Sequence, residues 1–84
     1  MLSYIEIIKK IECLEESNIL ISALELNIFS VMGKSSMTAK QVSRIAKIQS
    51  EGAEILLNAL AGMGVLLKFK NKYKNSAVTY KHFC

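Results

Sequence analysis

The side chains able to bind a metal or attack a substrate are few and scattered in this 84-residue chain. They are Cys13, His82 and Cys84. A structural zinc site normally takes four ligands at short spacings. Three widely spaced candidates therefore give only weak support to a metal- or redox-sensing regulator. Cys13 has no His or Asp beside it in sequence, and its acidic neighbours disfavour the thiolate that a nucleophile requires. We therefore expect no metal ligand and no catalytic residue in this chain.

The glycine pattern also fails to indicate a cofactor site. Gly62-Met63-Gly64 follows a predicted helix and precedes a predicted strand, whereas a nucleotide-binding loop runs from strand to helix. A doubly wound cofactor domain needs several βαβ units of about 30 residues each, more than one small domain of this length holds. The sequence predicts no cofactor bound by this chain and excludes most enzyme classes.

Charge is divided unevenly along the chain. Residues 1–33 carry two lysines and five glutamates, a net charge of −3, and residues 34–84 carry nine basic residues and two glutamates, a net charge of +7. A basic half favours nucleic acid as a partner. Its candidate contacts are Arg44, Lys68, Lys70, Lys72 and Lys74. Alternatively, lysines on an exposed hairpin keep its edge from pairing with other chains.

Other features of the sequence point to the cytoplasm. Two cysteines do not make a disulfide framework, so both are expected to be reduced thiols. The start lacks the positive region of a signal peptide, and Glu6 interrupts the first apolar stretch. No run approaches 18 uninterrupted apolar residues, so we expect no membrane span.

The first third of the chain predicts two helices rich in apolar residues. In the first, from Ser3 to about Glu16, apolar residues recur at steps of three and four. Glu15 falls inside this apolar arc, so we expect a break near Glu15–Ser17, with Ser17 capping the second helix. The second, residues 18–26, is apolar nearly all round and ends where Asn27 adopts the left-handed conformation.

A helix that is apolar on every side must be covered on every side. One 84-residue domain has few elements with which to cover it. We therefore expect these helices to form an interface between two copies of the chain. The predicted interface residues are Tyr4, Ile8, Ile11, Leu14, Ile19, Leu20, Ala23 and Leu24.

The middle of the chain predicts a helix-turn-helix. Thr38 and Gln41 have the spacing of a capping box, which begins a helix that runs to about Lys47. Ser50 is expected to cap a second helix, which ends at Gly64. The residues expected to face inward are Val42, Ile45, Ala46, Ile55, Leu56, Ala59, Leu60 and Met63.

Alternating residues then predict a β-hairpin. Phe69 is placed on the same face as Val65 and Leu67, and Tyr73 is expected to face the same way. That favours a three-residue loop, residues 70–72, with Asn71 or Lys72 left-handed. The tail gives no firm signal, although Val78, Tyr80 and Phe83 have the character to pack on the core.

The predicted fold is therefore mainly α: a winged helix-turn-helix with a C-terminal β-hairpin and extra N-terminal dimerisation helices. We expect one domain over residues 1–84, with interface helices in 1–33, the helix-turn-helix in 37–64 and the hairpin wing in 65–75.

Three segments resemble a known family. Residues 22–29 (SALELNIF), 37–42 (MTAKQV) and 55–67 (ILLNALAGMGVLL) are similar, in order and spacing, to the N-terminal dimerisation domain of S-adenosylmethionine-dependent O-methyltransferases. Asn27 stands where that family usually has Gly, and the hairpin lacks its usual Gly.

The resemblance implies a homodimer whose N-terminal helices interlock with the partner subunit. It also implies a catalytic methyltransferase domain that binds S-adenosylmethionine, and we expect that domain to be absent from these 84 residues. The acceptor substrate is not indicated.

The rival interpretation is a winged-helix DNA-binding transcriptional regulator. A recognition helix presents its first turns to the bases and phosphates. Here those turns hold Glu51 and Glu54 and no Lys or Arg. Two carboxylates facing a polyanion make this interpretation the weaker of the two.

Overall fold

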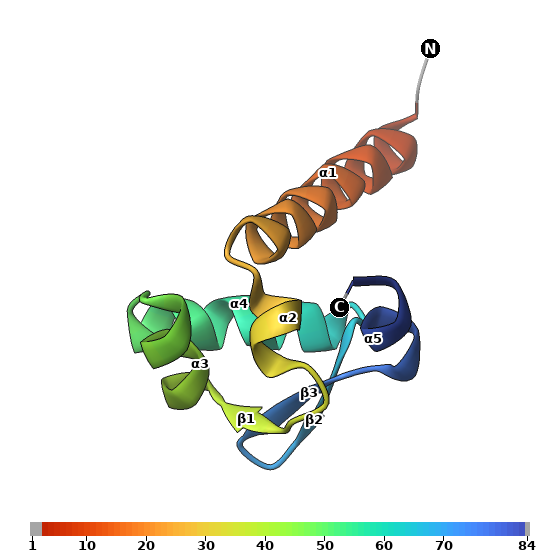
Figure 1. Cartoon of the computed structure of the whole chain (residues 1–84). Coiled ribbons are helices and arrows are strands. Elements are labelled where there is room, and N and C mark those ends of the chain that lie inside the picture. Colours follow the sequence, from red (N-terminus) through yellow and green to blue (C-terminus); the bar gives the residue numbers. More distant parts are fainter. Residues whose placement is uncertain (1–2, 84) are drawn as a thin grey trace.

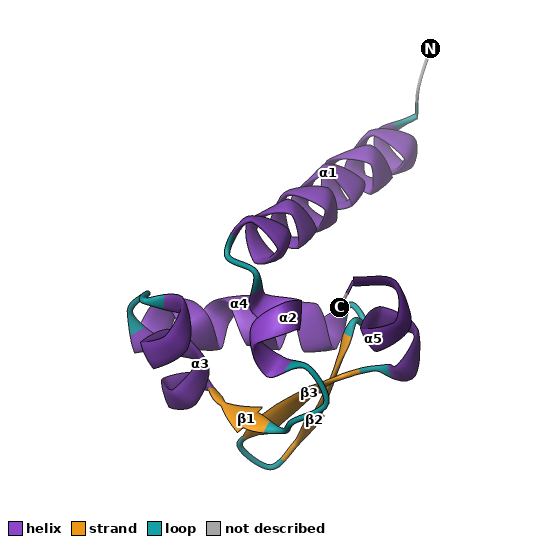
Figure 2. Cartoon of the chain, in the orientation of Figure 1, coloured by secondary structure: helices purple, strands orange, loops and turns teal. Residues whose placement is uncertain are grey.

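The computed structural model describes residues 3–83, except for the side chains of residues 7–14. Figure 1 shows the arrangement of its helices and strands, and Figure 2 shows their types. In chain order they are α1 (Tyr4–Glu25), α2 (Ile28–Met32), β1 (Met37–Thr38), α3 (Ala39–Ala46), α4 (Ser50–Gly62), β2 (Leu66–Phe69), β3 (Lys72–Asn75) and α5 (Ala77–Phe83). This confirms a mainly helical chain with a small antiparallel sheet.

The helix α1 is one continuous helix, so the predicted break near Glu15–Ser17 is wrong. Ser3 begins it, since its side chain accepts a hydrogen bond from the backbone N–H of Glu6 at 3.2 Å. Glu15 does not interrupt it because the Glu15 side chain is exposed to solvent. The helix ends as predicted, with Asn27 left-handed at φ 60°.

Most of α1 projects away from the body of the molecule (Figure 1). The radius of gyration is 13.9 Å and the long axis measures 46 Å, whereas a compact chain of this length has a radius of gyration of about 12 Å. Among the described side chains of α1, those near its C-terminal end reach the core, through the fully buried Ala23 and the partly buried Ile19 and Leu20. The rest of α1 is held out where another molecule can contact it.

The core lies between α2, α3, α4 and the sheet. Its buried side chains are Ala23, Ile28, Phe29, Met32, Val42, Leu57, Leu60, Leu66 and Tyr73. Two residues expected to face inward do not: Ile45 is 54% exposed and Ile55 is 68% exposed. The buried stripe of α4 instead follows Ala53, Leu57 and Leu60, at steps of four and three, which places Ile55 on the opposite side.

Local capping signals set the bounds of α3 and α4. Thr38 and Gln41 form the predicted capping box, with both reciprocal hydrogen bonds present, a motif worth about 1 kcal/mol. Lys47 then ends α3 in the left-handed conformation, at φ 59°. The N-cap of α4 is Gln49 rather than Ser50, which is the first helical residue. Gly64, at φ 80°, follows α4 as predicted.

The hairpin differs from the prediction in its loop and in the relation of its two faces, because Phe69 and Tyr73 do not face the same way. Its loop holds two residues, because Phe69 pairs directly with Lys72, and Lys70 rather than Asn71 is left-handed, at φ 56°. Lys68 therefore lies opposite Tyr73 on the inner face, beside the buried Leu66. A shift of one residue in loop length moves every side chain of a strand to the other face. Phe69 consequently points to solvent and is 77% exposed.

Two further elements were not predicted. The short strand β1 pairs antiparallel with β3, Met37 opposite Tyr73, and gives the strand order β1-β3-β2. The tail forms α5, and the ring of Phe83 stacks on that of Phe29 at a centroid distance of 5.3 Å. Of the three tail residues expected to pack on the core, Phe83 contacts it through this stacked ring although it is 39% exposed, and Val78 and Tyr80 are exposed.

Candidate functional site

Four described apolar side chains of α1 are exposed on a helix that projects from the body. Tyr4 and Ile5 are 78% and 65% exposed near the free end, and Ile21 and Leu24 are 50% and 45% exposed near the body. Burying such side chains is favourable by about 1.5–3 kcal/mol each. A projecting helix with this much apolar surface is suited to contact another molecule.

The predicted interface residues fall into four groups. Tyr4 and Leu24 are exposed, and Ile19 and Leu20 are half-buried against the core. Ala23 lies wholly inside the core of its own copy. The side chains of Ile8, Ile11 and Leu14 lie outside the described residues.

Ile5 and Ile21 are exposed apolar residues that the predicted interface set did not include. The position of Ile21 in the sequence could have identified it. Ile21 lies seven residues after Leu14, which is two turns further along the same face of a continuous helix. This relation was missed because a helix break was expected at Glu15–Ser17.

The five candidate nucleic-acid contacts predicted from the sequence lie on the hairpin and on α3, and one of them, Lys68, already makes a hydrogen bond within the chain. The ammonium group of Lys68 donates to Asn58 Oδ1 at 2.8 Å, and the Tyr73 hydroxyl donates to the same oxygen at 2.6 Å. Lys68 also lies 5.2 Å from the centroid of the Tyr73 ring. Lys70, Lys72, Lys74 and Arg44 are exposed.

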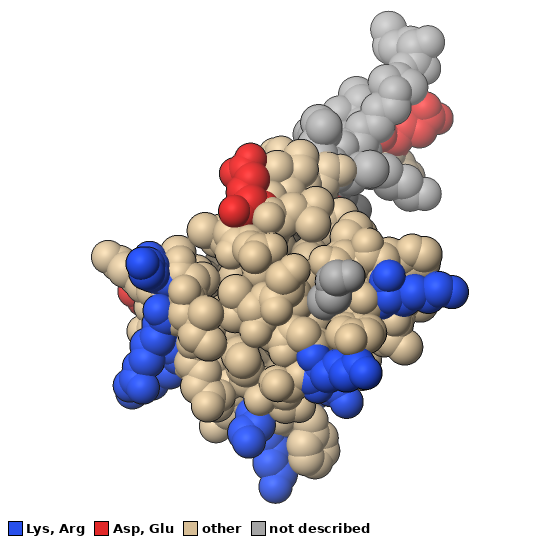
Figure 3. Space-filling view, viewed as in Figure 1, with Lys and Arg blue, Asp and Glu red and all other residues tan. Residues whose placement is uncertain are grey.

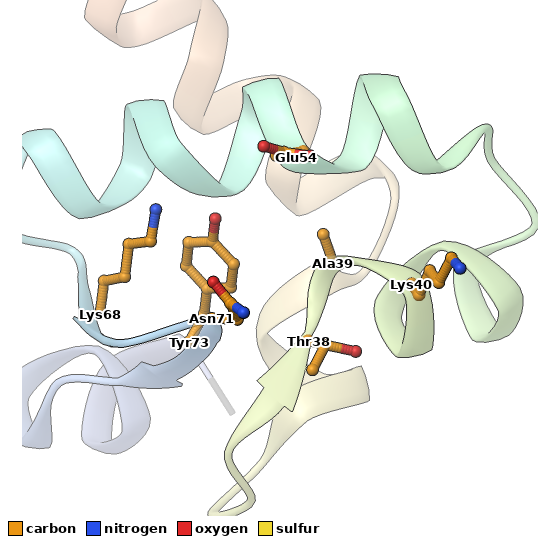
Figure 4. Close-up of a pocket in the computed structure, with 7 residues that line it drawn as sticks. All are labelled: Thr38, Ala39, Lys40, Glu54, Lys68, Asn71 and Tyr73. Carbon is orange, nitrogen blue, oxygen red and sulfur yellow. The ribbon is translucent and has the colours of Figure 1, made fainter.

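A shallow groove of about 350 Å³ runs between the hairpin, α4 and the start of α3 (Figure 4). Its lining residues are Thr38, Ala39, Lys40, Glu54, Lys68, Asn71 and Tyr73. Lys68 and Tyr73 point from the hairpin toward α4, which carries Glu54. This is a mixed-charge groove, because Lys40 and Lys68 share it with the carboxylate of Glu54, and Lys68 also donates to Asn58.

The first turns of α4 carry exposed Glu51 and Glu54. In Figure 3 the basic side chains stand in separate groups around the body, and the carboxylates visible on this face lie mainly over α1. On the face shown, the described basic side chains do not join into the continuous basic surface that tracks a nucleic-acid backbone.

The metal and membrane searches cover only the part of the chain that the structure describes. Among the described side chains, which leave out those of residues 7–14, no three His, Cys, Asp or Glu come together as a metal site; the side chains of Cys13 and Cys84 lie outside this set. Among the same residues, no helix has the length and hydropathy needed to cross a membrane.

Solved structures share this fold. An O-methyltransferase family protein from Burkholderia thailandensis is 26% identical, with a TM-score of 0.86 over 99% of this chain and 25% of its own. PigF, solved with SAH, is 22% identical, with a TM-score of 0.85 over 94% of this chain and 26% of its own. Human N-acetylserotonin methyltransferase, solved with SAM, is 20% identical, with a TM-score of 0.72 over 80% of this chain and 21% of its own.

This chain thus spans about a quarter of the length of the solved structures that it matches. No curated protein sequence matches it at a significant level. A family model for the O-methyltransferase dimerisation domain matches residues 8–82, nearly the whole chain. The chain therefore belongs to the O-methyltransferase dimerisation domain family.

Proposed function

We propose that this chain holds together two copies of an S-adenosylmethionine-dependent O-methyltransferase and contributes no catalytic group of its own. The observation that carries the proposal is the match to the dimerisation family together with the projecting, partly apolar α1. Methyl transfer and cofactor binding belong to a catalytic methyltransferase domain, which in the matched structures occupies the part of the chain outside this region. The cofactor of the whole enzyme is S-adenosylmethionine, as the relatives solved with SAM and SAH suggest.

Within this proposal, the chain divides as a winged helix with an added arm. Residues 1–33 form the interface helices, α3 and α4 within residues 37–64 form the helix-turn-helix, and β2 and β3 within residues 65–75 form the wing. The short connection between α3 and α4, residues 47–49, and the hairpin that follows them support this division. We place the protein in the cytoplasm, where its thiols stay reduced.

The proposed interface lies along α1. It includes most of the interface residues predicted from the sequence and two further exposed residues, Ile5 and Ile21. The predicted residues are Tyr4, Ile8, Ile11, Leu14, Ile19, Leu20 and Leu24. Ala23 acts on the interface indirectly, because its packing against the core of its own copy fixes the angle at which α1 leaves the body. A homodimer formed this way is expected to be isologous, with each copy contributing the same residues.

The self-association is tested by placing carboxylates on the exposed part of α1. We expect the double variant Ile21→Asp/Leu24→Asp to weaken dimerisation about 100-fold, because each substitution puts a charge into an apolar contact. Sedimentation-velocity ultracentrifugation over a concentration series measures this, and circular dichroism checks that the helices remain.

The matched control is Ile45→Asp/Ile55→Asp, which introduces the same charges at exposed isoleucines on α3 and α4. It should dimerise like the wild type. A wild-type chain that stays monomeric at tens of micromolar, or an α1 variant that dimerises normally, would contradict the proposal.

The regulator interpretation makes a separate prediction. We expect no sequence-selective retardation of duplex DNA in a gel-shift assay at near-physiological salt, because Glu51 and Glu54 oppose a polyanion at the start of α4. Weak retardation at low salt should disappear as salt is raised, since the exposed lysines give only non-specific contacts. Selective binding with a Kd of about 10⁻⁸ M or tighter would instead support the regulator.

A further inference from the structure

A second surface, distinct from α1 and from the mixed-charge groove, lies between the hairpin and α5. It is a pocket of about 340 Å³, which we call the hairpin–α5 pocket. Its lining residues are Gly33, Lys34, Leu67, Lys74, Asn75, Ala77 and Tyr80. Two of these residues are lysines, none is acidic, and none belongs to α1.

Hydrogen bonds from buried side chains hold the walls of this pocket in place. The Asn75 side-chain amide donates to the carbonyl oxygens of Phe29 and Gly33, both at 2.9 Å, and so ties the Gly33 loop to β3. The Thr79 hydroxyl donates to the Val65 carbonyl at 2.9 Å and ties α5 to the start of the hairpin. The pocket is therefore formed before any partner binds, which lowers the entropic penalty of binding.

The chemistry of the pocket selects an apolar group that lies beside a carboxylate. Leu67, Ala77 and the Tyr80 ring supply apolar surface. The Lys34 ammonium lies 5.2 Å from the centroid of the Tyr80 ring, and Lys74 is directly opposite Leu67 in the sheet register. Each amine thus stands next to an apolar side chain, and both are exposed.

The chain itself carries a segment of the complementary kind. Ile21, Leu24 and Glu25, which we call the α1 stripe, lie at steps of three and four on one face of α1, and all are exposed. Residues 1–33 have a net charge of −3 and residues 34–84 of +7. Packing α1 of one copy against α1 of another would bring two acidic segments together, whereas the hairpin–α5 pocket lies in the basic half.

We propose that in the dimer the α1 stripe of each copy seats in the hairpin–α5 pocket of the other. Ile21 and Leu24 contact Leu67 and Tyr80 of the second copy, and Glu25 lies near its Lys34 and Lys74. A two-fold axis makes the contact twice. This inference rests on the proposed function, because it names the surface that α1 contacts.

Charge reversal on each side of this contact gives a sharp test with two variants of the full 84-residue chain. Lys34→Glu/Lys74→Glu alters the pocket, and Glu25→Lys alters the α1 stripe. Each variant alone should dimerise about ten-fold more weakly than the wild type, because each places like charges together at both contacts. The matched control, Lys40→Glu/Arg44→Glu, reverses two exposed charges on α3 and should dimerise normally.

Mixing the two variants is the decisive measurement. In the mixed dimer, one contact pairs Lys at position 25 with the two glutamates, and the other contact is wild-type. Native mass spectrometry should therefore show the mixed dimer well above its statistical share. A statistical distribution, or single variants that dimerise as the wild type does, would overturn the inference while the proposed function stands. A monomeric wild-type chain would instead overturn the proposed function, and the inference with it.

Discussion

Replacing Phe29 by alanine is expected to lower the free energy of unfolding by about 3–5 kcal/mol. Phe29 is 2% exposed, and its ring both fills the centre of the core and stacks on the ring of Phe83. The substitution removes that apolar contact and leaves a cavity that the neighbouring helices fill only in part. A domain of this size has a total stability of about 4–13 kcal/mol, so Phe29→Ala should remove a large share of it.

Urea denaturation followed by far-ultraviolet circular dichroism measures this difference. All variants should be compared at one chain concentration, because self-association adds to the apparent stability. Phe69→Ala is the matched control, since the same truncation at a residue that is 77% exposed should change the unfolding free energy by less than about 0.5 kcal/mol. Equal losses of unfolding free energy for the two variants would contradict the assignment of Phe29 to the core and of Phe69 to the solvent-exposed face of the hairpin.

The elements that the sequence predicted correctly are those set by local chemistry. The Thr38–Gln41 capping box and the left-handed Asn27 depend on residues within one turn of each other, and both are present. The left-handed Gly64 after α4 belongs to the same class. Such signals are legible because the hydrogen bonds or backbone angles involved concern only neighbouring residues.

The prediction that Phe69 and Tyr73 share a face of the hairpin is wrong because the sequence allowed two loop lengths. Leu66 and Leu67 are both apolar and adjacent, so either can face the core. The choice depends on the loop, and Asn71 is the better residue type for a left-handed position. The structure instead places Lys70 there and closes the turn with two residues. Burial of Leu66 and Tyr73 together outweighs that local preference.

The interface residues were partly predictable for a related reason. The excess of apolar residues in the first third identified α1 as the region to examine, and Tyr4 and Leu24 are exposed there. Periodicity alone did not separate the residues that α1 buries in its own copy, such as Ala23, from those that it leaves exposed. That separation depends on where α2 and α4 meet the helix, which involves contacts between residues far apart in sequence.

Asn75 was not singled out by its sequence position, yet it joins three parts of the fold. Its side chain is buried, and its amide donates to the carbonyls of Phe29, at the start of α2, and of Gly33, in the loop before β1. The Phe29 carbonyl also accepts from the backbone N–H of Gly33 at 2.9 Å. Removing the Asn75 amide therefore affects the Gly33 carbonyl more than the Phe29 carbonyl, and it also empties the space that the side chain fills.

We expect Asn75→Ala to lower the free energy of unfolding by about 2–3 kcal/mol, because the partly buried Gly33 carbonyl loses this donor and a small cavity opens. Asn75→Asp keeps the shape but places carboxylate oxygens against two carbonyls, so at neutral pH it should destabilise at least as much. Asn71→Ala in the exposed hairpin turn is the control, and its effect should stay below about 0.5 kcal/mol.

If Asn75→Asp unfolds like the wild type in urea, the two amide hydrogen bonds do not stabilise the fold. If both Asn75 variants destabilise, their folded fraction should also dimerise more weakly, because the Gly33 wall of the hairpin–α5 pocket is no longer held.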